Sequence, residues 1–182
     1  THIRRVSVSS LLRTQFEWFY PLSEQHQIQF KIDAPKELYW NTDSVYFKKI
    51  LANLISNAFK YTEDGGTVRI SLHEEENFLV LKVYNTGKGI EEADMQNIFD
   101  RYRILGTMDN DDNRQNTTRN GLGLFICHSL VQSLGGKIDI ESEVGQYAEF
   151  TVTLPFGIVE ETSDNTIDEE IPVSLPSPNT DI

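Results

Sequence analysis

The sequence predicts a two-layer α+β sandwich, with helices packed on one face of a single β-sheet. Segments with apolar residues at helical spacing are interspersed with short segments in which apolar and polar residues alternate. Their order along the chain is helix, strands, long helix, hairpin, loop, helix and hairpin. The chain has 182 residues, of which 38% are hydrophobic, and this is enough for one domain with one packed core.

The first predicted elements are a short strand and a helix. Residues 6–8 alternate as a strand does. Apolar residues then recur at helical spacing over residues 11–22, and Ser9 or Ser10 is expected to cap this helix. Pro21 interrupts the pattern and predicts a kink or an early end, because proline lacks the amide hydrogen that a helix uses.

Two more strands and a long helix come next. Residues 27–33 and 38–40 alternate and predict short strands. Asp43 or Ser44 is expected to cap the long helix. Its helical pattern is a continuous apolar stripe made of Val45, Phe47, Ile50, Leu51, Leu54, Ile55 and Ala58.

The middle of the chain predicts a hairpin between two turns. Residues 63–66 have a turn composition, and residues 67–73 and 78–84 alternate as paired strands. A glycine turn at residues 85–89 and a short helix at residues 91–99 follow.

A long polar loop precedes the last elements. Residues 104–120 are nearly all polar, so this segment is expected to lack a core of its own and to be mobile. A helix is predicted over residues 121–134, and strands are predicted at residues 137–142 and 149–154.

Charge divides the chain into a domain and a tail. The net charge is −12, and residues 158–182 carry seven acids and no base. The other 21 acids and 16 bases leave residues 1–157 with a net charge of −5. We therefore expect a domain at 1–157, an acidic linker or tail at 158–182, and no nucleic-acid partner.

The sequence also indicates a compartment. Cys127 is the single cysteine, so no disulfide can form within the chain. No apolar stretch approaches the roughly 20 residues of a membrane helix, and no signal peptide is visible. These observations predict a cytoplasmic domain without direct membrane contact.

Residues 53–61 contain the first group of candidate functional side chains. Asn53 and Asn57 are four residues apart, so they lie on one face of the long helix. An amide oxygen can bind Mg²⁺, and Lys60 is placed to reach phosphate groups. The alternative is that these side chains are simply solvated, and this segment alone does not decide between the two.

Two glycine-containing segments are the other candidates. Residues 83–90 lead from a strand into a turn whose glycines allow a flat ligand to approach the backbone, and Asn85 can both donate and accept hydrogen bonds. Residues 120–124 place glycines at a helix N-terminus, where N–H groups face outward toward a phosphate. Taken singly, each segment is equally compatible with an ordinary turn or junction.

Taken together, the segments resemble a known family. Their order and spacing are similar to those of the N, G1, F and G2 boxes of sensor histidine kinases, at residues 53–61, 85–90, 99–103 and 121–124. Histidine kinases belong to the GHKL superfamily, with gyrase, heat-shock chaperone and mismatch-repair ATPases. The resemblance extends from about residue 6 to residue 155. It implies an ATP-binding catalytic domain with a Bergerat-type α/β sandwich and one mixed sheet.

The resemblance assigns a role to each matching residue. Asn57 would ligate Mg²⁺, Asn53 and Lys60 would contact phosphates, and Arg101 or Arg103 would be the cation of an ATP lid at residues 104–120. The residues expected around the adenine base are Tyr61, Asn85, Gly87, Gly89 and Ile90. Phe99 and Tyr102 would anchor the lid. The residues whose backbone would face the phosphates are Gly121, Leu122, Gly123 and Leu124.

Asn53 separates two kinds of chemistry. Hydrolytic members of the superfamily have a glutamate at this position, which acts as a general base toward water. An asparagine cannot accept a proton near neutral pH. The resemblance therefore implies phosphoryl transfer to a histidine, with weak hydrolysis of ATP.

Several positions depart from the family pattern. Asn85 and Arg119 stand where the pattern has an aspartate and a glycine, and Tyr147 and Ala148 replace a glycine and a small hydroxyl residue. Arg103 lies one residue earlier than the usual arginine. These departures motivate an alternative, a catalytically weak nucleotide-binding or protein-interaction module of the same fold.

The phosphoacceptor is expected elsewhere. None of the four histidines, His2, His26, His73 and His128, lies in a phosphoacceptor motif. The resemblance thus implies transfer to a dimerisation domain of the parent kinase and a response regulator receiver domain as a further partner. The fragment is expected to be a monomer, and the parent a homodimer with a membrane-bound sensor part. A stand-alone hydrolase is the third reading, which Asn53 disfavours.

Overall fold

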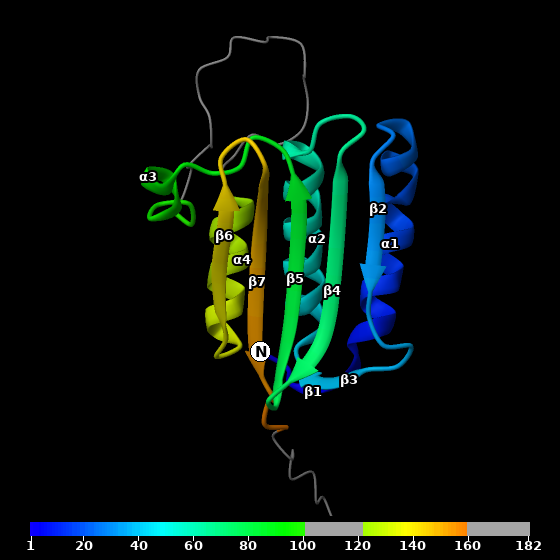
Figure 1. Ribbon diagram of the computed structural model, residues 1–182. Helices are drawn as coiled ribbons and strands as arrows, with labels where there is room; N and C mark the ends of the chain where they lie inside the picture. The colour runs from blue at the N-terminus through cyan, green and yellow to red at the C-terminus, as the bar shows by residue number, and fades with distance from the viewer. Residues whose placement is uncertain (101–121, 160–182) are drawn as a thin grey trace, which may run out of the picture.

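The computed structural model describes residues 1–100 and 122–159. These residues form two layers, with a sheet on one side and α1, α2 and α4 packed against one of its faces (Figure 1). The elements follow one another as β1 (Arg4–Ser7), α1 (Val8–Gln25), β2 (Gln29–Asp33), β3 (Tyr39–Thr42), α2 (Ser44–Tyr61), β4 (Thr67–Glu75), β5 (Phe78–Thr86), α3 (Glu92–Met95), α4 (Gly123–Ser133), β6 (Lys137–Glu143) and β7 (Tyr147–Pro155).

The main sheet has five strands in the order β2-β4-β5-β7-β6. β2 pairs with β4 in parallel, and the other three pairs are antiparallel. The predicted mixed sheet with helices on one face is therefore confirmed. β1 and β3 lie outside this sheet and form a separate antiparallel ribbon. β1 leads directly into α1, and β3 is followed by α2.

The core lies between the two layers. Strands β4, β5 and β7 alternate buried and accessible side chains, as strands covered on one face must. The longest buried stripe comes from α2, where Phe47, Ile50, Leu51 and Leu54 are at most 1% exposed. Val45, which the sequence placed in this stripe, is 54% exposed because it lies in the first turn on the outer side of α2. The core thus fixes α2 rigidly against the sheet.

Asp43 caps α2. Its Oδ1 accepts hydrogen bonds from the amides of Val45 at 2.9 Å and Tyr46 at 3.1 Å, and its Oδ2 accepts from the amide of His2 at 2.7 Å. Burial alone would raise the pKa of Asp43, but these amides stabilise the carboxylate and lower the pKa below its ordinary value. The predicted cap is confirmed, and it anchors the N-terminal end of the helix that carries Asn53 and Asn57.

The start and end of α1 differ from the sequence prediction. The N-cap is Ser7, without a side-chain cap, and not Ser9 or Ser10. Ser9 is buried, and its hydroxyl accepts a hydrogen bond from the amide of Leu38 at 2.9 Å. The helix also continues past Pro21 to Gln25, and within this last turn only Ser23 is buried, with its hydroxyl donating to the Tyr20 carbonyl.

The helix predicted at residues 91–99 is shorter than expected. α3 spans only Glu92–Met95, and turns follow it. In these turns the amides of Asn97 and Asp100 bond to carbonyls three residues back, which keeps Ile98 buried without a regular helix. Apolar spacing of three to four residues fits both arrangements, so the sequence pattern could not separate them.

The segment after β7 stays attached to the ribbon. The Trp40 Nε1 donates to the Pro155 carbonyl at 3.0 Å, and the Gly157 amide donates to the Asn41 carbonyl at 2.9 Å. The domain limit at residue 157 remains a prediction, and residues 160–182 of the expected tail lie outside the described residues. Within the described ranges, no helix combines the length and hydropathy that crossing a membrane requires.

Candidate functional site

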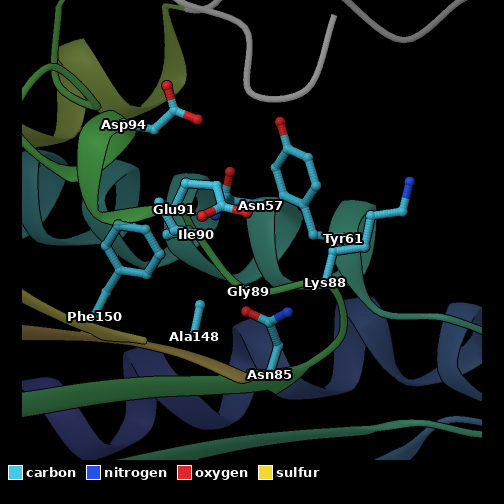
Figure 2. A pocket seen from close by; sticks show the side chains of 10 residues that line it. All are labelled: Asn57, Tyr61, Asn85, Lys88, Gly89, Ile90, Glu91, Asp94, Ala148 and Phe150. Atoms are coloured by element: carbon cyan, nitrogen blue, oxygen red, sulfur yellow. The ribbon is translucent and has the colours of Figure 1, made fainter. Parts of the chain in front are cut away.

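A cavity of about 210 Å³ opens between the end of α2, the end of β5, α3 and the start of β7. Figure 2 shows the side chains around it. Three parts of the chain that are distant in the sequence contribute to the lining, which consists of Asn57, Tyr61, Asn85, Lys88, Gly89, Ile90, Glu91, Asp94, Ala148 and Phe150.

Asn85 forms a polar point in the floor of the cavity. It is 3% exposed, and its Nδ2 donates to the Thr86 carbonyl at 3.0 Å. A carbonyl oxygen can only accept, so this bond fixes which end of the amide is the nitrogen. The Oδ1 is left on the side of Ala148 and Ile90 (Figure 2). Asn85 Oδ1 can therefore accept a hydrogen bond from a ligand in the cavity.

The other walls near Asn85 are apolar. Ile90, Ala148 and Phe150 are 6%, 5% and 2% exposed, and all three line the cavity. Ala148 lies directly opposite Asn85 in the β5–β7 register. A mostly apolar cavity with one oriented acceptor suits a flat heterocycle that carries a donor group.

The two glycines of the turn after β5 have different surroundings. Gly89 lines the cavity at φ +67°, and a Cβ atom there would overlap the Glu143 carbonyl. Gly87 does not line this cavity. It lies beside a neighbouring hollow, at φ +151°, where a Cβ atom would overlap the Tyr61 carbonyl. Gly87 thus contacts the end of α2, and its place beside a nucleotide base remains a prediction.

The candidate side chains of α2 divide into three groups. Asn57 and Tyr61 line the cavity, and the Asn57 side chain has no hydrogen-bond partner within the described part of the chain. Asn53 faces α4 instead, since a Cβ atom on Gly123 would lie 3.4 Å from Asn53 Oδ1. Lys60 is exposed, with its Nζ 5.2 Å from the centre of the Tyr61 ring.

The N-terminus of α4 lies beside Asn53. The helix begins at Gly123, and the N-cap residue Leu122 provides no side-chain cap. Leu124 packs against the core, which fixes the first turn. An uncapped helix start next to an amide side chain is suitable for binding an anion.

Phe99 is the last of the expected site residues before the described chain breaks. Its ring stacks on that of His128 in α4, with centroids 4.9 Å apart and planes inclined by 17°. The structure thus places Phe99 against the middle of α4. Arg101, Tyr102, Arg103, Gly121 and the expected lid at 104–120 lie outside the described residues.

Comparison with known proteins identifies the family. Residues 42–158 match the family described as histidine kinase-, DNA gyrase B- and HSP90-like ATPase. The chain belongs to this ATPase family. The sensor protein SrrB of Staphylococcus aureus is 36% identical over 120 residues, which cover 66% of this chain and 20% of that protein. The chain therefore spans about a fifth of the curated relatives that it matches.

Solved structures place the chain within the histidine kinase branch of the ATPase family. The nucleotide-free catalytic domain of the histidine kinase ThkA has a TM-score of 0.74 and 25% identity, covering 86% of this chain and 97% of that one. Full-length ShkA in complex with AMPPNP has a TM-score of 0.71 and 26% identity, covering 85% and 31%. The resemblance to a sensor histidine kinase ATPase domain is confirmed.

Several lining residues of this ATPase domain were missed by the sequence reasoning. Lys88, Glu91, Asp94 and Phe150 line the cavity, but no role was expected for them. Phe150 was detectable, because it lies on the same buried face of β7 as Ala148 and Val152 and so faces the helices. The other three lie in a loop or a single-turn helix, where a short sequence carries no periodic signal.

The departure at Tyr147 does not affect the cavity. Its ring stacks on Tyr84, with centroids 5.4 Å apart, and Tyr84 alternates with buried residues that face the core. The Tyr147 hydroxyl donates to Glu141 Oε1 at 2.7 Å, and this bond raises the pKa of Tyr147 to about 12. The large side chain therefore covers the open face of the sheet, away from the helices.

Proposed function

We propose that this domain binds ATP with Mg²⁺ and transfers the γ-phosphoryl group to a histidine on the dimerisation domain of its parent kinase. The observation that carries the proposal is the oriented Asn85 oxygen in an apolar cavity, within the family shown above. The cavity lies at the C-terminal end of α2. Asn57 lines the cavity, and Asn53, one turn earlier on α2, faces Gly123 at the start of α4.

Asn85 selects adenine in this proposal. The exocyclic amino group of adenine would donate to Asn85 Oδ1, and Ile90, Ala148 and Phe150 would enclose the ring. Guanine has a carbonyl oxygen at the corresponding position, so two acceptors would face each other. Leaving a buried acceptor unpaired costs about 1–3 kcal/mol, which predicts at least a severalfold preference for ATP over GTP.

The residues present are compatible with a Mg²⁺ ion that arrives with the nucleotide. The described residues contain no group of three His, Cys, Asp or Glu side chains that could hold a metal ion. Asn57 offers one amide oxygen in the cavity, and Mg²⁺ in such sites takes its other ligands from phosphates and water. When bound, the ion would neutralise charge on the phosphate groups.

The remaining residues act on the phosphate chain in this proposal. Asn53 and the first turn of α4, at Gly123 and Leu124, would hold it by amide and N–H donors. Lys60 would add a positive charge from the end of α2. Asn53 cannot act as a general base, so the domain orients phosphate without activating water, and the acceptor is the histidine.

The partners and the lid follow from the same proposal. Arg101 or Arg103 would supply the lid cation, and Phe99 and Tyr102 would anchor the lid. Gly121 and Leu122 would add to the phosphate-facing backbone. The parent would be a homodimeric sensor with this domain in the cytoplasm, and a response regulator receiver domain would accept the phosphoryl group from the histidine. ThkA has been solved in complex with the response regulator protein TrrA, and this gives the proposal its precedent.

The second candidate is a module of the same fold that binds nucleotide weakly and acts through protein contacts. Asn85 in place of an aspartate and Ala148 in place of a hydroxyl residue favour it, because the first removes a negative charge and the second a hydroxyl group from the base site. The orientation of the Asn85 oxygen argues against it, since the acceptor function is retained.

Calorimetric titration tests nucleotide binding directly. The domain is titrated with AMPPNP with and without Mg²⁺, and Asn57→Ala is compared with Ser56→Ala, an exposed neighbour on α2. We expect Mg²⁺ to strengthen the binding of AMPPNP by the wild type and by Ser56→Ala. In Asn57→Ala, we expect Mg²⁺ to strengthen it much less. No binding by the wild-type domain would favour the protein-contact module.

A further inference from the structure

The turn between β6 and β7 packs against the loop that lines the cavity. The Gly87 amide donates to the Gln146 carbonyl at 3.1 Å, and the Gly145 amide donates to the Lys88 carbonyl at 2.7 Å. Gly89 lies so close to the turn that a Cβ atom would overlap the Glu143 carbonyl. The loop at residues 87–90 is therefore supported from outside the cavity by a second loop.

Ser142 makes the side-chain contact in this support. Its Oγ accepts from the Ile90 amide at 2.8 Å and donates to the Tyr147 carbonyl at 2.6 Å. The direction of both bonds is fixed, because an amide can only donate and a carbonyl can only accept. One hydroxyl thus joins the cavity loop to the β7 backbone, at the residue before Ala148.

The position of Ser142 in the sheet explains this geometry. Ser142 lies opposite Ala148 in the β6–β7 register, and Ala148 lies opposite Asn85 in the β5–β7 register. The three residues form one row across neighbouring strands on the face that carries the helices. Asn85 and Ala148 line the cavity, while Ser142 lies at the end of the row and reaches Ile90.

We propose that Ser142 is a positioning residue of the base site, which holds Ile90 in place through the hydroxyl bridge to the Tyr147 carbonyl. The support of Ile90 by Ser142 does not depend on the proposed function. Only the expected effect on a ligand rests on the proposed nucleotide binding. Ser142 does not itself line the cavity, and its effect on a ligand passes through the Ile90 backbone. Without the hydroxyl, the Ile90 amide loses its partner, and the loop samples positions in which the apolar wall no longer fits a planar ring.

Amide hydrogen exchange measured by NMR on the nucleotide-free domain tests the bridge itself. In Ser142→Ala we expect exchange of the Ile90 amide to accelerate about tenfold or more, while the Leu81 amide in the middle of β5 is unchanged. Ser142→Thr keeps a hydroxyl and is expected to retain the protection. Ser71→Ala is the matched control, because Ser71 is a strand serine on the open face of the same sheet.

Titration with AMPPNP tests the consequence. We expect Ser142→Ala to weaken binding about tenfold, with Ser142→Thr and Ser71→Ala close to wild type. Ser142→Cys has nearly the size of serine and provides a second variant, with the same loss expected, if the alanine variant folds poorly. Unchanged Ile90 protection in Ser142→Ala and Ser142→Cys would overturn the inference, as would weaker binding with that protection intact.

The two proposals fail in different ways. If the wild-type domain binds no AMPPNP, the proposed function is wrong, and the exchange experiment still decides whether Ser142 holds Ile90. If the wild type binds AMPPNP and Ser142→Ala binds it equally well, the proposed function stands and the role of Ser142 in the base site is refuted.

Discussion

Replacing Asn85 with leucine separates base recognition from folding. Leucine has a similar size and shape but no acceptor, so the adenine amino group would meet an apolar side chain. The substitution removes the bond from Nδ2 to the Thr86 carbonyl, which is worth about 0.5–1.5 kcal/mol. It also places an apolar side chain at a site that is 3% exposed, which offsets part of that loss. We expect the free energy of unfolding to change by no more than about 1 kcal/mol.

Binding is expected to respond more strongly than stability. An adenine amino group left unpaired in the cavity costs about 1–3 kcal/mol, which corresponds to a loss of about fivefold to 150-fold in affinity for AMPPNP. The guanine of GMPPNP carries a carbonyl oxygen where adenine carries its amino group, so it has no donor to lose. The affinity of Asn85→Leu for GMPPNP should therefore stay within about threefold of the wild-type value. The preference for adenine over guanine should therefore largely disappear in Asn85→Leu.

Calorimetry with both analogues and urea unfolding measure the two effects on the same variant. An Asn85→Leu domain that keeps its preference for AMPPNP over GMPPNP would refute the role of the Asn85 oxygen. A large loss of stability would instead show that the bond to Thr86 supports the fold, and the binding data would then not be interpretable as base recognition.

Three further predictions follow from the geometry. Asp43→Ala should lower the free energy of unfolding by about 1–2 kcal/mol at pH 7, as measured by urea unfolding. Because the folded-state pKa of Asp43 lies below its ordinary value of 3.8, this difference should be complete above that pH and shrink as the pH falls below it. Gly89→Ala should lower the melting temperature and weaken AMPPNP binding, since φ is +67° and the added Cβ would overlap the Glu143 carbonyl, at a cost of at least about 1–2 kcal/mol; an unchanged melting curve would contradict it. Cys127 should resist a thiol reagent at pH 8 in the native domain and react in urea, because burial raises its pKa to about 12; rapid labelling of the folded domain would show that α4 opens.

The main features of the fold were predictable because they depend on periodic patterns. The α2 stripe and the strands β4, β5 and β7 are long enough for burial to repeat several times, and Asp43 has the short acceptor side chain that a cap requires. The pairing of β1 with β3 was not predictable. Each strand has four residues, and alternation over so short a segment indicates a strand without indicating its partner. Pairing of short strands depends on distant contacts, such as that of Val6 with Trp40.

The candidate site was predicted in part for a related reason. Asn57, Asn85 and Ile90 lie in segments whose residue types indicated a ligand, and the structure brings them together around one cavity. The support behind them was not visible in the sequence. Ser142 and Gly89 meet only because β6 lies beside β7, and the turn at residue 145 then reaches the loop after β5. The contact of Gly87 with the Tyr61 carbonyl was not visible either, because a glycine pattern does not reveal which backbone atom approaches it.

The central claim is that this domain transfers a phosphoryl group to a histidine, and transfer in trans tests it most directly. The domain is incubated with ATP labelled at the γ-phosphate, Mg²⁺ and the histidine-bearing dimerisation domain of the parent kinase, with Asn57→Ala and Ser56→Ala in parallel. We predict an acid-labile label on the dimerisation domain with the wild type and Ser56→Ala, and little label with Asn57→Ala. Binding of ATP without any transfer, or rapid release of inorganic phosphate by the domain alone, would contradict the account.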